Sequence, residues 1–147
     1  MIHDAIYSFV IADAGFQSVA GLPTGRTDKS TGLFAMVAQK QPSLPYCVYF
    51  DVGETPVYSL QGQNRLQAVR IRFSCTASTI KGARQLARQI QRTLNGIPAG
   101  FTMQGNVELH GAFFRSIIDS AETEGHMTLY SAHLDMEFWF IDTDQSV

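Results

Sequence analysis

The segment RLQAVRIRFSCTASTIKGARQLARQIQRTLNG, residues 65–96, contains the two patterns that decide the fold class. Apolar and polar residues alternate in its first part, which predicts a β-strand with one buried face. The face predicted to be buried consists of Val69, Ile71, Phe73 and Cys75. From Thr79 to Asn95 the apolar residues recur every three or four positions, which predicts an amphipathic helix. A strand is thus followed by a long helix.

The limits of this helix are marked by residues typical of helix ends. Ser78 or Thr79 can cap the N-terminus with a side-chain oxygen. Gly96 follows the last periodic residue and Pro98 stands two positions further on, which predicts the C-terminal end. The stripe expected to face the core is Ala83, Leu86, Ala87, Ile90 and Leu94.

On both sides of this segment the chain is richer in strands than in helices. A short helix is predicted over His3–Asp13, and the polar, glycine-rich segment Gly21–Gly32 is predicted to be a loop. Strands are predicted over Leu33–Ala38, Tyr46–Val52, Val57–Leu60, Val107–Asp119 and Thr128–Ile141. Tyr46–Val52 is apolar on both faces, which indicates a central strand covered on both sides. GETP is predicted to form a bend, and Gln61–Arg65 and Ala121–His126 are predicted to connect strands.

This order of elements predicts an α+β fold. We expect an antiparallel or mixed sheet, a long helix packed on one face and a short N-terminal helix. Residues 1–147 suit one domain, and we expect the last few residues to be flexible. The hydrophobic share of 45% can supply one core without disulfides, so Cys47 and Cys75 are expected to be buried thiols.

Charge and hydropathy exclude several classes of protein. The formal net charge of −2 argues against a general nucleic-acid binder, which needs a surplus of basic residues. No apolar run approaches the roughly 20 residues of a membrane span, and the N-terminal segment lacks the basic start of a signal peptide. We therefore expect no contact with a membrane.

A search for catalytic and metal-binding motifs finds none. The chain has no zinc-binding histidine pair on a helix, no nucleophile elbow and no phosphate-binding loop. His110 and His133 could meet across the two last strands, either as a hydrogen-bonded pair or as ligands of a bridging metal. Asp119, Glu122 and Glu124 are interpreted as a solvated turn rather than acid and base catalysts. We expect no enzyme activity, no metal and no cofactor.

The charges are segregated along the sequence. Seven basic residues and no acidic one lie between residues 65 and 92, whereas eight acidic residues and one basic residue follow residue 100. If these two parts lie apart, the surface is polarised; if they adjoin, the charges form internal ion pairs. Arg84, Arg88 and Arg92 recur every four residues and form one stripe, predicted to face away from the core.

Four short motifs carry a resemblance to a known family. They are DAIY at residues 4–7, LPYCVY at 44–49, YSLQG at 58–62, and ARQL followed by LNG between residues 83 and 96. In this order, over nearly the whole chain, they resemble the tail-completion, or tail-terminator, proteins that join tail to head in long-tailed bacteriophages. Each motif alone is common, so the order gives the resemblance its weight.

The resemblance implies a structural protein of the virion, located at the head–tail junction and assembled in the cytoplasm of the host bacterium. Such proteins form a hexameric ring that caps the tail tube and binds the connector or stopper protein of the head. DNA passes through the ring without sequence-specific binding. Two alternatives stay open: a small bacterial α+β domain that binds a ligand or is an enzyme, and a sibling phage part such as a head-side stopper or tail-tube subunit.

Candidate interface residues lie in the two polar loops, on the arginine stripe and in the last turn. We expect the loops to become ordered on contact with partners. The stripe is either a solvated helix face or a surface that meets acidic residues of a neighbouring subunit or docking partner, with Asp142 and Asp144 as further acidic candidates. The candidates are Arg26, Lys29, Gln61, Gln63, Asn64, Arg65, Arg84, Arg88, Arg92, Asp119, Glu122 and Glu124.

Overall fold

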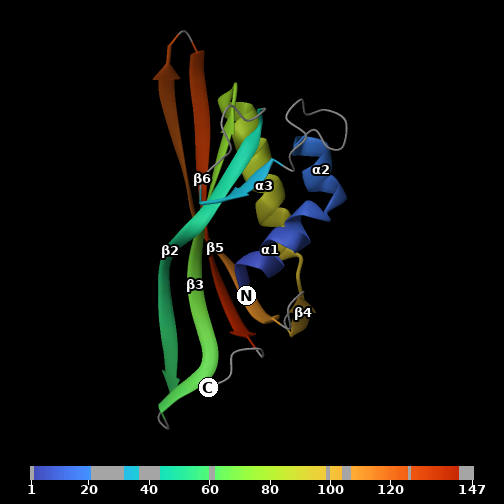
Figure 1. The fold of residues 1–147 in the computed structure, drawn as a ribbon, viewed down its shortest axis with the longest axis vertical. Coiled ribbons are helices and arrows are strands. Elements are labelled where there is room, and N and C mark those ends of the chain that lie inside the picture. The colour runs from blue at the N-terminus through green and yellow to red at the C-terminus, as the bar shows by residue number, and fades with distance from the viewer. Residues whose placement is uncertain are drawn as a thin grey trace.

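A computed structural model describes residues 2–20, 32–36, 44–59, 62–98, 100–103, 107–125 and 127–142, which form three helices and a six-stranded sheet (Figure 1). The helices are α1 (Ile2–Ile11), α2 (Ala14–Ala20) and α3 (Ile80–Asn95). The strands are β1 (Leu33–Ala35), β2 (Tyr46–Ser59), β3 (Gly62–Ala77), β4 (Phe101–Met103), β5 (Val107–Glu124) and β6 (Met127–Asp142).

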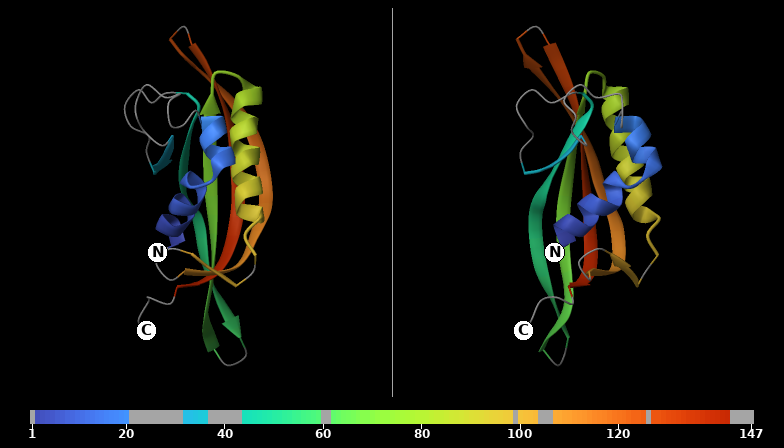
Figure 2. Two further views of the ribbon diagram at one scale, coloured as in Figure 1. Left: turned by 90° about the vertical axis from the view of Figure 1, so that its right-hand side faces the viewer. Right: turned by 45° about the vertical axis from the view of Figure 1, so that its right-hand side comes forward.

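The sheet is mixed, and its strand order is β1-β2-β3-β6-β5-β4. Strand β1 runs parallel to β2, whereas all other neighbours are antiparallel. The α+β class is therefore confirmed in outline. The three helices lie on one side of the sheet, and the β2–β3 and β5–β6 hairpins extend beyond them at opposite ends (Figures 1 and 2).

The core lies between the helices and the sheet, and it is built from the alternating faces of β3 and β6. All four predicted core residues of β3 are buried, and so are alternate residues of β6: Ala132, Leu134, Met136, Phe138 and Phe140. They form one cluster with the apolar stripe of α3 and with Ile6, Val10 and Phe16 of the N-terminal helices. Burial of apolar surface on this side of the sheet is the main stabilising contribution.

Helix α3 begins and ends near the predicted residues. Thr79 is the N-cap, and its Oγ1 accepts a hydrogen bond from the Gly82 amide at 3.0 Å. Gly96 closes the C-terminus, where its amide donates to the Arg92 carbonyl at 3.1 Å. The predicted apolar stripe of α3 is fully buried.

The long strands are longer than predicted, because pairing with a neighbour outweighs weak local propensity. Strand β2 continues through the predicted bend, where the register shifts between Asp51 and Gly53. Residues 62–65, predicted to lie in a connection, belong to β3. Strand β5 extends to Glu124, so the turn to β6 is shorter than predicted and includes Gly125, whose φ of +64° favours glycine.

The prediction that β2 is covered on both faces is wrong. Cys47 and Tyr49 are buried beneath the helices, but Tyr46, Val48 and Phe50 are only half-buried on the opposite face. The helices cover one face of the sheet, and among the described residues no helix covers the other face (Figure 2). The predicted loop Gly21–Gly32 lies outside the described residues except for its last glycine.

Candidate interaction surface

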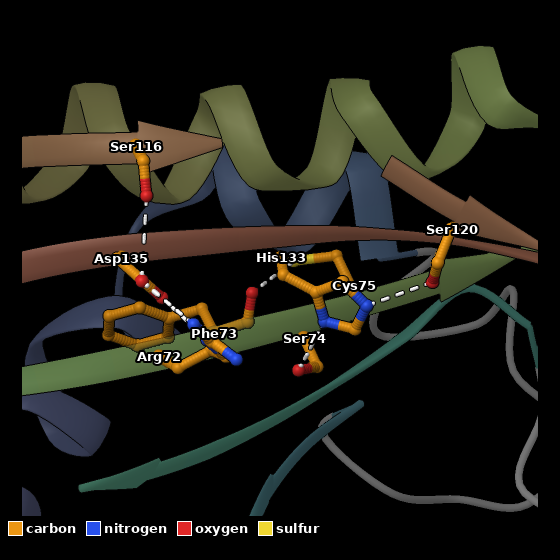
Figure 3. A network of polar contacts seen from close by, with 8 residues as sticks. All are labelled: Arg72, Phe73, Ser74, Cys75, Ser116, Ser120, His133 and Asp135. Carbon is orange, nitrogen blue, oxygen red and sulfur yellow. Dashed lines mark hydrogen bonds and ion pairs between the residues drawn. The ribbon is translucent and has the colours of Figure 1, made fainter. Parts of the chain in front are cut away.

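A bidentate ion pair lies on the helix-free face of the sheet (Figure 3). Arg72 of β3 and Asp135 of β6 stand directly opposite each other, with Nε–Oδ1 and Nη2–Oδ2 distances of 2.7 and 3.0 Å. Asp135 is only 7% exposed although it lies on the helix-free face. Its hydrogen bond from Arg72 lowers the pKa of the carboxyl below the ordinary value of 3.8, against the opposing effect of burial.

The next side chain on this face of β6, two residues before Asp135, is His133, which lies between two serines. The Oγ of Ser74 lies 2.8 Å from His133 Nδ1, and the Oγ of Ser120 lies 2.9 Å from Nε2 (Figure 3). Burial lowers the pKa of His133 below 6.5, and Arg72 adds to this effect. The histidine is therefore mainly neutral at pH 7, and neither ring nitrogen bonds a carboxylate that could orient it as a base.

The proposed pairing of His110 with His133 is wrong. His133 stands opposite Ile118, eight positions from His110 on β5 and thus about 26 Å along the strand. His110 Nε2 instead lies 3.2 Å from Glu108 Oε1. Within the part of the chain that the structure describes, no three His, Cys, Asp or Glu side chains converge on a possible metal position.

The two oppositely charged parts of the sequence adjoin in the fold. Besides the pair of Arg72 and Asp135, Arg70 lies 3.8 Å from Glu137 across the same two strands. Arg84 of α3 bonds Asp119 of β5 through Nε, at 3.1 Å from Oδ1, and through Nη2. Internal pairing thus neutralises these arginines, and Asp119 already has a partner in its own chain.

The remaining arginines of the α3 stripe are exposed and have no carboxylate partner among the described residues. The guanidinium of Arg88 lies 5.7 Å from the ring centroid of Phe114 and donates to Gln91 Oε1 at 2.8 Å. Arg92 is exposed one turn further along α3. These two side chains carry the free positive charge of the stripe.

A groove of about 850 Å³ runs between α2 and α3, with this stripe along it. Its polar lining comprises Ser18 of α2 and, on α3, Lys81, Arg84, Gln85, Arg88, Gln89 and Arg92. We call it the α3 groove. It brings four basic side chains together, those of Lys81, Arg84, Arg88 and Arg92.

Asp13 fixes the position of α2 beside α3. Its Oδ2 accepts hydrogen bonds from the Phe16 amide at 2.8 Å, from Thr93 Oγ1 at 2.9 Å and from Gln89 Nε2 at 3.1 Å. Burial alone would raise the pKa of Asp13, but the three hydrogen bonds outweigh it and lower the pKa below 3.8. One carboxylate therefore caps α2 and ties it to one side of the groove.

Several predicted interface residues cannot be placed. Arg26, Lys29 and Gln61 lie outside the described residues. Gln63, Asn64 and Arg65 lie in β3 and Glu124 ends β5, but only their backbones are described. Glu122 is exposed near the end of the β5–β6 hairpin.

Comparison with known proteins gives a fold and no family. No family model matches the chain, and no curated protein matches it. Among solved structures, a chain of the virion of a native gene transfer agent particle has a TM-score of 0.66, covering 94% of this chain and 92% of that chain. The two share 14% sequence identity, so the likeness shows the fold alone. No described helix has the length and apolar character of a membrane span.

Proposed function

We propose that this protein is a structural component of a phage-like virion, and that it completes the tail. In this proposal six copies form a ring that caps the tail tube and joins it to the connector or stopper protein of the head. The supporting observation is the fold, which matches a chain of a gene transfer agent virion over nearly the full length of both chains. The ordered motifs from DAIY to LNG support the more specific role in tail completion.

The sheet has edges that suit assembly. On one side, β4 pairs only with Val107–Leu109 of β5, and on the other side β1 pairs only with residues 47–49 of β2. Among the described residues, no strand pairs with the remainder of either outer edge. Open edges present backbone groups that can bond a strand of another chain. These edges lie on opposite sides of the sheet, as a heterologous contact between successive subunits requires.

The proposal includes no chemical reaction, metal or cofactor. His133 lies between Ser74 and Ser120, while the adjacent carboxylate of Asp135 is bound by Arg72. Burial raises the pKa of the Cys47 thiol, which disfavours the nucleophilic thiolate. The described residues thus lack an activated nucleophile, which favours a role in binding over the alternative of a small enzyme.

Light scattering after size-exclusion chromatography, together with negative-stain electron microscopy, tests the ring. We expect one species of six times the chain mass and closed rings of uniform diameter. Polymers of unlimited length would favour a tail-tube subunit. A protein that stays monomeric at all concentrations, alone and with its tail-tube partner, would refute the ring and favour a small binding domain.

A further inference from the structure

Resting on the proposed assembly, we propose that the α3 groove binds the end of the β5–β6 hairpin of a second copy of this chain, through the exposed residues Glu122 and Thr123 of β5 and Met127 of β6. The groove supplies positive charge and amide groups, and the projecting hairpin end supplies the exposed carboxylate of Glu122. The contact is heterologous, since it joins two different patches. Contacts of this kind close into a ring when the rotation between subunits permits it.

The groove carries charge that its own chain leaves free. Arg88 and Arg92 have no carboxylate partner among the described residues, and Lys81, exposed at the start of α3, forms no ion pair with a described residue. Successive arginines of the stripe are about 6 Å apart along the helix axis. This spacing matches two strand positions, about 6.6 Å apart on one face of a β-strand. Exposed side chains on one face of the hairpin strand, Glu122 among them, can therefore meet successive positions of the stripe.

The hairpin end carries the complementary charge. The sequence contains no Lys or Arg after Arg115, and Glu122 is exposed with no ion pair to a described residue. Met127, 55% exposed, adds a flexible apolar side chain at the same end. The groove offers Val19 and Ile80 as apolar contacts for it. Both charge and apolar surface are thus matched between the two patches.

The hairpin cannot reach the free arginines of its own chain. Asp119 already meets Arg84, and Glu122 lies about 10 Å further along β5, toward the hairpin end. That end of the hairpin projects beyond the helices (Figure 1). Arg92 lies about 12 Å from Arg84 in the opposite direction. Only a second copy can therefore bring Glu122 to Arg88 and Arg92. The net charge of −2 favours this occupant over a nucleic acid.

Variants of the full chain with one added cysteine each test the contact without removing a charge. Gln85→Cys places a thiol in the groove and Thr123→Cys places one on the hairpin, both at exposed positions. Cys47 and Cys75 are buried, so a short bismaleimide should react mainly with the introduced thiols. We expect the mixture of the two variants to form cross-linked heterodimers. Thr102→Cys, at an exposed position of β4, is the matched control and should cross-link poorly with Gln85→Cys.

Charge reversal is the second test of the contact. Arg88→Glu with Arg92→Glu should weaken self-association about tenfold or more in light scattering, and Glu122→Arg in the same chain should restore part of it. Arg84 is left intact because it bonds Asp119 in its own chain. Circular dichroism verifies that each variant is folded.

The outcomes separate this contact from the proposed function. Rings that form without the cross-link between positions 85 and 123, or that tolerate charge reversal, would overturn the contact and leave the ring standing. A chain that stays monomeric would overturn both. Loss of DNA binding on charge reversal, with self-association unchanged, would overturn the contact and assign the groove to a nucleic acid.

Discussion

Replacing Arg72 by Ala is expected to destabilise the protein more than replacing its partner Asp135 by Ala. The reason is the unequal exposure of the two side chains. That of Asp135 is 10% exposed and that of Arg72 is 34% exposed. After Arg72→Ala, a buried carboxylate keeps only Ser116 Oγ, at 3.5 Å, as a nearby donor. After Asp135→Ala, the guanidinium can turn toward water.

The magnitudes follow from this asymmetry. Removing one partner of a buried pair costs about 3–5 kcal/mol. The Arg72→Ala variant is expected at the lower limit, about 3 kcal/mol, because the pair lies at the rim of the uncovered face and water reaches Arg72. For Asp135→Ala we expect about 1–2 kcal/mol, the cost of the lost charged hydrogen bonds less the hydration regained by the arginine. A loss of about 3 kcal/mol lowers the melting temperature by roughly 6–12 °C.

Urea denaturation at pH 7, followed by circular dichroism, measures both variants. The pH dependence is a second observable, because Arg72 holds the pKa of Asp135 below 3.8. A carboxyl with a lowered pKa stabilises the fold above pH 3.8, and this contribution is lost as the pH falls through the folded-state pKa. Arg72→Ala should therefore reduce the loss of stability that the protein shows on acidification. Equal costs for both variants, or a larger cost for Asp135→Ala, would refute the reasoning.

Three further predictions concern the helices. Asp13→Ala should cost about 2 kcal/mol because α2 loses its N-cap on the Phe16 amide. Asp13→Asn should keep most of the cap but lose the stability that the wild-type carboxylate gives up on acidification through its lowered pKa. Urea titrations at pH 3 and pH 7 compare the two variants with the wild type, and identical pH profiles would contradict the assignment. Thr79→Ala should cost about 1 kcal/mol through the lost bond to Gly82, and Thr79→Asp should not, as chemical denaturation will show. Leu86→Ala should cost about 2–5 kcal/mol because the side chain is fully buried. At roughly 2–4 °C per kcal/mol, a melting temperature within 2 °C of the wild type would contradict this cost.

The strand β3 and the helix α3 could be predicted from the sequence because both are strongly periodic. Alternation placed Ile71 and Phe73 on the buried face, and the 3.6-residue period placed Leu86 and Ile90 there. The lengths of the hairpins could not be predicted, since they depend on pairing between strands that have weak propensity of their own. Sequence periodicity also could not show that β2 has only one covered face, because coverage depends on where the helices pack.

The candidate site was predicted only in part. The stripe of Arg84, Arg88 and Arg92 follows from its spacing, but the pairing of Arg84 with Asp119 depends on the position of β5 beside α3. The role of Asp13 was missed, although an aspartate three residues before Phe16 is an N-cap signal. Predicting the pair of Arg72 and Asp135 requires the register of β3 on β6, and single-sequence patterns do not give that register.

Electron microscopy of purified particles, labelled with a gold-tagged antibody against this chain, tests the central claim most directly. The particles are those made by cells that carry the gene, and particles from a deletion strain are the control. The account predicts label at one position, the junction between head and tail, and unjoined heads and tails in the deletion strain. Label along the tail or on the head shell, or joined particles without the protein, would contradict it.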